Sequence, residues 1–215
     1  MIKDRLESLY GELSKDINLV AVSKTKSVKD IMNAYDCGQR LFGENRVQEL
    51  TEKYNELPKD IKWNMIGHLQ SNKVKYIASF VDLIHSVDSI KLALEINRQG
   101  EKNNRIISCL IQIKISKDES KYGVSYDEFD QFYNHLNNLK FINVVGLMGM
   151  ASLTNNEDLI KNEFNSISLL YNKLKLVDKN FRYLSIGMSN DYKLAINEGG
   201  NMIRIGSRIF GERQI

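Results

Sequence analysis

The stretch RYLSIGMSNDYKLAINEGGNMIRIGS, residues 182–207, contains the pattern that decides the fold. Apolar runs at 182–186 and 202–205 flank an amphipathic stretch at 190–198. Asn190 stands where a helix N-cap is expected and Gly199 where the helix ends. A strand, a helix and a second strand in this order predict two parallel strands joined by a right-handed crossover.

The same unit recurs along the whole chain. Short apolar runs, the expected strands, lie at 17–23, 40–43, 62–67, 82–86, 105–115, 141–149, 182–186 and 202–205. Helical patterns lie at 2–14, 28–38, 45–56, 70–79, 88–99, 126–138, 157–178 and 190–198. Ser27 and Asp88 are expected N-caps, and Gly38 and Gly100 are expected helix ends.

Two α/β architectures fit this alternation. The count of strands favours a closed (β/α)8 barrel of the TIM type with an extra N-terminal helix. The alternative is a doubly wound open sheet, which commonly has a glycine-rich first turn, whereas the first turn here reads SKTK, residues 23–26. We therefore predict the barrel, as a single domain over residues 1–215.

Composition excludes several classes of function. The 30 basic and 27 acidic residues give a net charge of +3, without the basic excess typical of nucleic-acid or membrane binding. No apolar run approaches the roughly 18 residues of a membrane span, and the charged start is unlike a signal peptide. Cys37 and Cys109 have no spacing typical of metal ligands. These features predict a cytoplasmic protein without a metal site.

A lysine follows the first predicted strand. In both architectures the functional site lies beyond the carboxyl ends of the strands, and Lys24 directly follows the apolar run 17–23. Desolvation lowers the pKa of an amine and leaves it nucleophilic, which an imine with an aldehyde requires. The alternative is a solvated loop lysine, equivalent to Lys26.

Glycines and hydroxyls follow the last two predicted strands. Ser189 ends the segment SIGMS after the seventh strand, and Gly206 and Ser207 follow the eighth. In barrels the backbone N–H groups of these two loops commonly bind phosphate. The alternative is a pair of ordinary turns with serine N-caps.

Arg204 is expected inside the barrel. Alternation along MIRI places Ile203 and Ile205 toward the helices and Arg204 inward, where a charge requires a partner. That partner is either a barrel carboxylate or the ring nitrogen of a ligand.

Other candidates carry weaker signals. We expect His68 to be a structural residue, and His85 and His135 to have no partner. Met148 and Met188 are candidates to line a ligand.

Eight short stretches of the sequence resemble the motifs of a known family. They are AVSKTK (21–26), FGENRVQE (42–49), IGHLQSNK (66–73), HSVDS (85–89), ESKYG (119–123), GLM (146–148), LSIGMSNDY (184–192) and MIRIGSRIFGER (202–213). With these motifs in this order, the chain resembles the YggS/PROSC family of pyridoxal phosphate (PLP) homeostasis proteins. Asn64 stands where many members have histidine, and Ile186 replaces the usual methionine.

The resemblance implies a PLP-binding barrel similar to the N-terminal domain of bacterial alanine racemase. By position in the motifs, Lys24 would hold PLP as a covalent imine and Arg204 would lie beside the pyridine nitrogen. Ser189, Gly206 and Ser207 fall on the phosphate-binding segments, and Asn45 on a residue of the pocket.

The implied function is a PLP carrier or reservoir without robust catalytic turnover. Its expected partners are PLP and apo-enzymes that use it, and we expect a monomer. The first alternative is a small PLP-dependent enzyme such as an amino-acid racemase, although the second, β-rich domain of similar racemases has no expected counterpart here. The second is a barrel enzyme for a phosphorylated metabolite, in which Lys24 would bond to the substrate.

Overall fold

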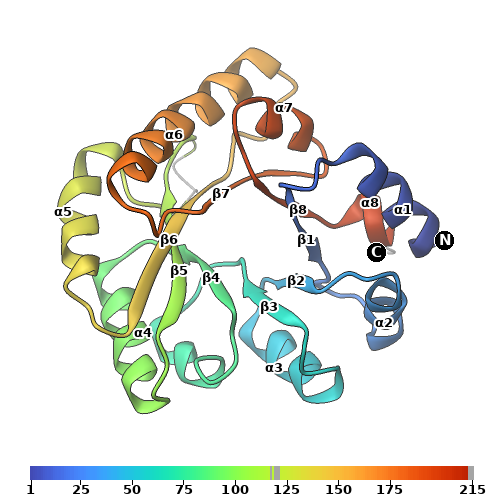
Figure 1. Ribbon diagram of the computed structural model, residues 1–215, viewed down its shortest axis with the longest axis horizontal. Helices are drawn as coiled ribbons and strands as arrows, with labels where there is room; N and C mark the ends of the chain where they lie inside the picture. Colours follow the sequence, from blue (N-terminus) through green and yellow to red (C-terminus); the bar gives the residue numbers. More distant parts are fainter. Residues whose placement is uncertain (117, 119–121, 213–215) are drawn as a thin grey trace.

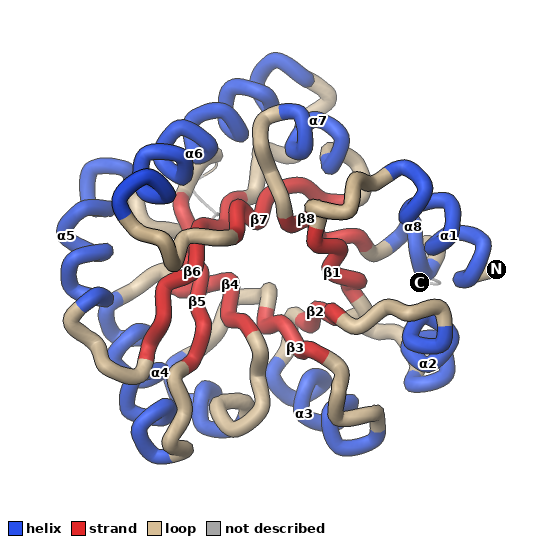
Figure 2. The backbone as a smooth tube through the Cα atoms, viewed as in Figure 1, coloured by secondary structure: helices blue, strands red, loops and turns tan. Residues whose placement is uncertain are grey.

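The strands form a closed ring and the helices surround it (Figure 1). The computed structural model describes residues 1–116, 118 and 122–212. All strand pairs are parallel, and β8 pairs with β1 to close the ring that Figure 2 shows in red. The predicted barrel with an extra N-terminal helix is confirmed. Residues 119–121 of the ESKYG motif lie outside the described residues.

The elements follow the predicted order. The strands are β1 (Asn18–Val22), β2 (Leu41–Glu44), β3 (Lys62–Met65), β4 (Leu83–Val87), β5 (Ile107–Ile113), β6 (Ile142–Gly149), β7 (Tyr183–Met188) and β8 (Met202–Ile205). The helices are α1 (Ile2–Glu12), α2 (Val28–Asp36), α3 (Val47–Glu56), α4 (Ile90–Lys102), α5 (Tyr126–Asn137), α6 (Glu157–Val177), α7 (Tyr192–Asn197) and α8 (Ser207–Phe210). A 3₁₀ helix, η1 (Ser71–Tyr76), follows β3.

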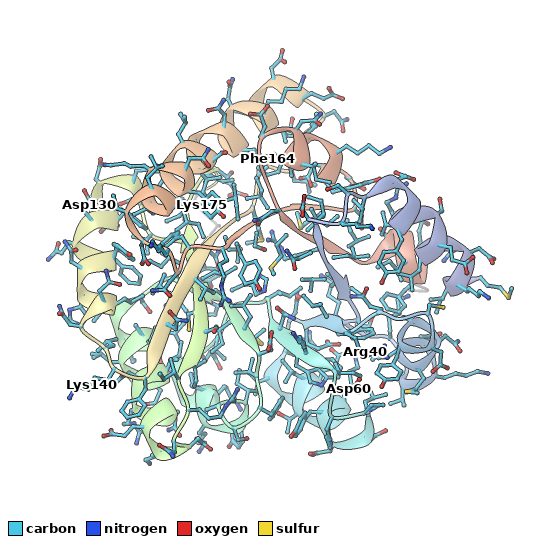
Figure 3. All side chains as sticks on the ribbon, viewed as in Figure 1. Arg40, Asp60, Asp130, Lys140, Phe164 and Lys175 are labelled. Carbon is cyan, nitrogen blue, oxygen red and sulfur yellow. The ribbon has the colours of Figure 1, made fainter. Side chains whose placement is uncertain are left out.

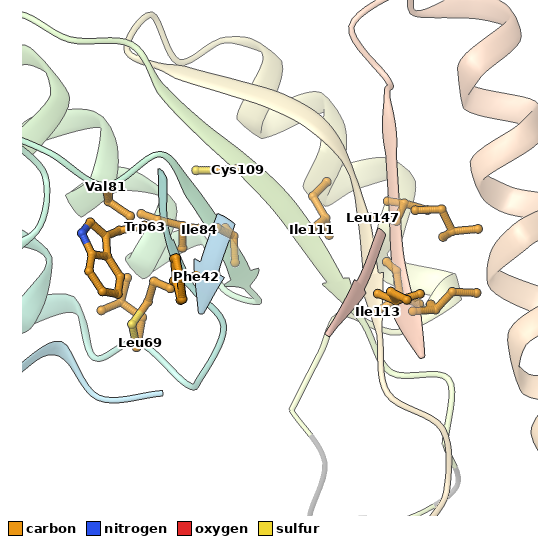
Figure 4. Packing of buried hydrophobic residues seen from close by; sticks show 14 of the residues in the cluster. Phe42, Trp63, Leu69, Val81, Ile84, Cys109, Ile111, Ile113 and Leu147 are labelled. Carbon is orange, nitrogen blue, oxygen red and sulfur yellow. The ribbon is translucent and has the colours of Figure 1, made fainter. Parts of the chain in front are cut away.

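Apolar side chains form two layers. The larger layer lies between the strands and the helices, and Figure 4 shows part of it around Phe42, Trp63 and Ile84. A smaller cluster fills the interior of the barrel and consists of Val20, Leu83, Leu110, Val145, Met148 and Met202. The interior is therefore solid below its carboxyl-end mouth, as in other barrels of this type.

Ion pairs connect segments outside the barrel. Arg40, before β2, binds Asp60, before β3, with 3.0 Å between Nε and Oδ2, and the two labels are adjacent in Figure 3. Glu12 at the end of α1 pairs with Lys193 on α7 and Arg208 on α8. Helix α1 thus packs beside α8 on the outside of the barrel. No helix in the described residues is long and apolar enough to cross a membrane.

Helix boundaries differ from the prediction at a few positions. Ser27 caps α2 as expected, but the N-cap of α4 is Ser89 and not Asp88. Helix α4 continues past Gly100 to Lys102. Gly100 packs against the backbone of Arg105 and the side chain of Phe141, which leave no room for a Cβ. Close packing therefore explains this glycine, which does not end the helix.

In two further segments the predicted helix type or N-cap residue is wrong. The stretch expected as a helix at 70–79 is the shorter 3₁₀ helix η1. The N-cap of α7 is Asp191 and not Asn190. Asp191 Oδ1 accepts the N–H of Met188, so this carboxylate holds the turn between β7 and α7.

Candidate functional site

A cavity of about 880 Å³ opens at the carboxyl ends of the strands. Segments that follow β1, β2, β3, β6, β7 and β8 line it. All six residues that the sequence singled out are in this lining: Lys24, Asn45, Ser189, Arg204, Gly206 and Ser207. The structure thus brings the six residues together at the mouth of the barrel, and their roles in binding stay predictions.

Lys24 lies in a tight turn that directly follows β1. The turn is closed by the N–H of Lys26, which donates to the carbonyl of Ser23 at 3.0 Å. Lys24 is half-buried, and Lys26 lines the same cavity and reaches toward the Phe210 carbonyl. The helix that follows, α2, is capped by Ser27, whose hydroxyl accepts the N–H of Asp30. The lysine is thus held between a barrel strand and a capped helix.

Arg204 points into the barrel, as the alternation along β8 predicts, and is buried. Its Nη1 donates to the carbonyl and the hydroxyl of Ser185 at 2.7 and 2.6 Å, and Nη2 donates to the Gly149 carbonyl at 2.9 Å. Neutral oxygens, and no barrel carboxylate, accept these hydrogen bonds. Burial lowers the pKa of Arg204 to about 10, partly opposed by the charge of Asp191. The guanidinium therefore stays charged at neutral pH.

A chain of buried polar side chains continues from Ser185 across the barrel. His85 Nδ1 lies 3.1 Å from the Ser185 hydroxyl, and His85 Nε2 lies 3.0 Å from Asn64 Oδ1. Asn64 Nδ2 donates to the carbonyls of Phe42 and Lys62, so its oxygen must face the histidine. Nε2 is therefore the protonated nitrogen, and Nδ1 accepts the serine proton.

This chain corrects the expectation that His85 has no partner. Burial, and then the charge of Arg204, hold the pKa of His85 well below 6.5, so the ring is neutral. The Ser185 hydroxyl donates its proton to His85, and its oxygen therefore accepts the hydrogen bond from Arg204 Nη1. Asn64, which departs from the family pattern, supplies the far end of the chain. Sequence reasoning missed the contact between His85 and Ser185 because it crosses the barrel from β4 to β7, two strands that do not pair.

The loops after β7 and β8 meet at the cavity. The N–H of Gly206 donates to the Ser189 hydroxyl at 3.2 Å, and Ser207 lies next to them at the rim. Gly187 has a φ of +88°, and a Cβ there would lie 2.6 Å from the Cβ of Ala195. A glycine is therefore required for β7 to turn into this loop.

The remaining candidates are divided between the cavity and the core. Met188 lines the cavity, whereas Met148 is buried in the interior cluster and is not part of the lining. His68 lies outside it, stacked on Tyr122 and 3.6 Å from Asp88. His135 is exposed on α5. The described residues contain no group of three or more metal-ligating side chains.

The lining combines three kinds of chemistry. A primary amine (Lys24) lies in one cavity with a fixed guanidinium (Arg204) and with hydroxyl and backbone donors (Ser189, Gly206, Ser207). An amine can bond to an aldehyde, a guanidinium can donate to an aromatic nitrogen, and clustered donors can bind a phosphate.

Comparison with known proteins places the fold and the family. The alanine racemase N-terminal domain family matches residues 1–214. The alanine racemase of Clostridium difficile superposes with a TM-score of 0.84 at 15% identity, over 100% of this chain and 57% of that one. At this identity the likeness concerns the fold alone, and it confirms the predicted resemblance to the racemase barrel.

Other proteins are similar to this chain in sequence as well as in fold. The pyridoxal phosphate homeostasis protein of Haemophilus influenzae is 38% identical, covering 99% of this chain and 93% of that protein. The protein of the same name from Aquifex aeolicus is 37% identical, over 91% of this chain and 87% of its own. PipY of Synechococcus elongatus, solved with PLP bound, superposes with a TM-score of 0.89 at 35% identity, covering 98% of this chain and 100% of PipY. The chain therefore belongs to the family of pyridoxal phosphate homeostasis proteins.

Proposed function

We propose that the protein binds PLP through Lys24 and serves as a carrier or reservoir of the cofactor. The observation that carries this proposal is the convergence of the six predicted residues in one cavity of a barrel whose relative PipY binds PLP. Apo-enzymes that use PLP are the proposed recipients.

The residues present fit the three functional groups of PLP. The Lys24 amine would form a C=N bond with the aldehyde carbon, and the aldehyde oxygen would leave as water with two protons from the amine. Ser189, Ser207 and the N–H of Gly206 would hold the phosphate, and Asn45 would line one wall. In the structure the Gly206 N–H donates to the Ser189 hydroxyl, which brings the two loops together, and this N–H would leave the hydroxyl to reach the phosphate.

Arg204 favours a carrier over an enzyme. A charged guanidinium donates to the pyridine nitrogen without giving up a proton, so the ring stays unprotonated and withdraws electrons weakly. Its hydrogen bonds to Ser185 and Gly149 hold it in this orientation. We propose that the protein has no robust turnover on amino acids.

Covalent mapping tests the binding proposal. The protein is incubated with PLP, reduced with borohydride, digested and analysed by peptide mass spectrometry. We expect the pyridoxyl group on Lys24, with the label lost in Lys24→Ala and kept in Lys26→Ala. Labelling mainly at Lys26, or equal labelling of Lys24→Ala, would contradict the assignment.

Solvent exchange tests the carrier against a small racemase, which the shared racemase fold makes the second candidate. PLP-loaded protein is incubated in D₂O with a panel of L-amino acids, and deuterium at Cα is measured. We expect no exchange above the level of the Lys24→Ala control. Rapid exchange that depends on Lys24 would establish an enzyme.

A further inference from the structure

A buried cluster of charges lies on the outer side of the barrel, between β2 and α3. Its centre is Lys53 of α3, which is 6% exposed. The ammonium donates to Glu44 Oε1 at 2.8 Å, to Glu49 Oε1 at 2.7 Å and to the Ser23 carbonyl at 2.8 Å. An ammonium has three N–H donors, and these contacts use all of them. The direction of every Lys53 hydrogen bond is thereby fixed.

The cluster holds the backbone on both sides of Lys24. On one side, the Ser23 hydroxyl donates to Glu44 at 2.6 Å and its carbonyl accepts from Lys53. On the other side, the N–H of Thr25 donates to the same Glu49 oxygen that Lys53 binds. Lys24 is thus the residue between two clamped peptide groups.

Thr25 shows that these contacts, the clamp formed by Glu44, Glu49 and Lys53, hold the backbone in a conformation that it does not prefer. Its φ is +64°, in the left-handed region that β-branched residues rarely adopt. Residues persist in such conformations where the surroundings over-determine them, and such positions concentrate at functional sites. In this chain the constraint on Thr25 comes from Glu49 and the turn from Ser23 to Lys26.

Burial of this cluster needs a reason besides stability. Glu44 is fully buried, and its Oε2 has no hydrogen-bond partner among the residues that the structure describes. Desolvation raises the pKa of Glu44, and Lys53 and Ser23 counteract this shift. A buried ion pair of this kind contributes little net stability compared with an apolar replacement.

We propose that Glu44, Glu49 and Lys53 are positioning residues that set the direction from which Lys24 enters the cavity, and so control imine formation. This inference rests on the proposed PLP binding at Lys24. The chemical step is unchanged: the Lys24 nitrogen bonds to the aldehyde carbon and one water is released. The clamp acts on the backbone that presents the amine and does not contact the reacting atoms.

Glu49 is the residue to vary, because its side chain is 20% exposed and its loss leaves Lys53 paired with Glu44. Glu49→Ala removes the acceptor of the Thr25 N–H, whereas Glu49→Gln keeps a carbonyl oxygen there. Glu52→Ala, on the exposed face of the same helix, is the matched control. Two ligands are titrated: PLP, which can form the imine, and pyridoxine 5′-phosphate, which lacks the aldehyde.

We expect Glu49→Ala to weaken PLP binding about tenfold, measured by the absorbance of the imine. Without Glu49, Thr25 can leave the left-handed conformation, and the preference against that conformation corresponds to about a factor of ten in affinity. Its affinity for pyridoxine 5′-phosphate should stay within about twofold of wild type. Glu49→Gln should recover most of the loss, and Glu52→Ala should match wild type. A purely structural role would weaken both ligands equally or lower only the melting temperature, and either result would overturn the inference.

Thr25→Gly supplies a second, independent variant. Glycine adopts the left-handed region without strain, so Glu49→Ala should weaken PLP binding less in the Thr25→Gly background than in wild type. Equal losses in both backgrounds would refute the clamp. Failure of the proposed function has a different signature: wild-type protein would form no imine, or would form it away from Lys24, and the inference would fall with it.

Discussion

Ser185 is the hydroxyl on which the buried polar chain depends, and Ser185→Ala is the sharpest test of that chain. The substitution keeps the backbone carbonyl that accepts from Arg204, but removes the oxygen between Arg204 and His85. Ser185 is fully buried, so water cannot replace the hydroxyl without a rearrangement. His85 Nδ1 would be left as a buried acceptor without a donor.

The size of the effect follows from the bonds lost. A hydrogen bond to a charged group contributes about 1.5–3 kcal/mol, and one between neutral groups about 0.5–1.5 kcal/mol. Because Arg204 keeps its bonds to the carbonyls of Ser185 and Gly149, we expect the free energy of unfolding to fall by about 3 kcal/mol. For a chain of this length that lowers the melting temperature by about 6–12 °C.

Urea unfolding measures this loss directly. Trp63 is the single tryptophan and is 1% exposed, so its fluorescence reports the opening of the outer core. The midpoint should shift and the slope stay constant. Ser8→Ala, on the exposed side of α1, is the control. A loss below about 0.5 kcal/mol for Ser185→Ala, no larger than the usual effect of a surface substitution, would refute the hydrogen-bond assignment.

Three further outcomes are expected. Because burial and Arg204 hold the pKa of His85 well below 6.5, the unfolded chain binds a proton that the folded chain rejects. Stability should therefore fall as pH drops below about 6.5 toward the folded pKa, by up to about 1.4 kcal/mol per pH unit, and the NMR signals of the His85 ring should remain those of a neutral ring at pH values of roughly 5.5. A native titration near 6.5 would contradict this. Ser207→Ala should weaken PLP binding roughly ten- to a hundredfold with the fold intact, and unchanged affinity in an equilibrium titration would remove Ser207 from the site. Gly187→Ala should destabilise the protein by at least about 1–2 kcal/mol, because its φ is +88° and the new Cβ would meet Ala195; an unchanged thermal melt would count against the strain.

The fold could be predicted because its signals are local. Each strand is an apolar run and each helix has its own periodicity, so the ring could be anticipated before any contact was known. The errors occurred where tertiary contacts override local preference. Gly100 has no room for a side chain beside Phe141. The Asp191 carboxylate accepts the N–H of Met188 in the turn after β7.

The site was predictable to the extent that it follows from strand ends. Lys24, Ser189 and Gly206 lie within two residues of a strand end, and parallel strands bring their carboxyl ends together. The supporting contacts were not predictable in this way. The bonds of His85 depend on the register of β3, β4 and β7, and those of Lys53 on which face of α3 meets β2. The contact between His85 and Ser185 joins residues 100 positions apart in the chain, and the contact between Lys53 and Glu44 forms only when α3 packs on β2, so neither has a local sign in one sequence.

The filled interior of the barrel has a kinetic consequence. Val20, Leu83, Leu110 and Met202 fill the barrel below its mouth, so a ligand reaches the cavity from the mouth side and not through the barrel. A molecule that enters from solution and one that leaves toward a recipient must use the same path. If an apo-enzyme docks over that mouth to collect PLP, it also shuts out free PLP while it is bound. Loading and delivery would then alternate, and a high concentration of apo-enzyme would slow the refilling of the cavity.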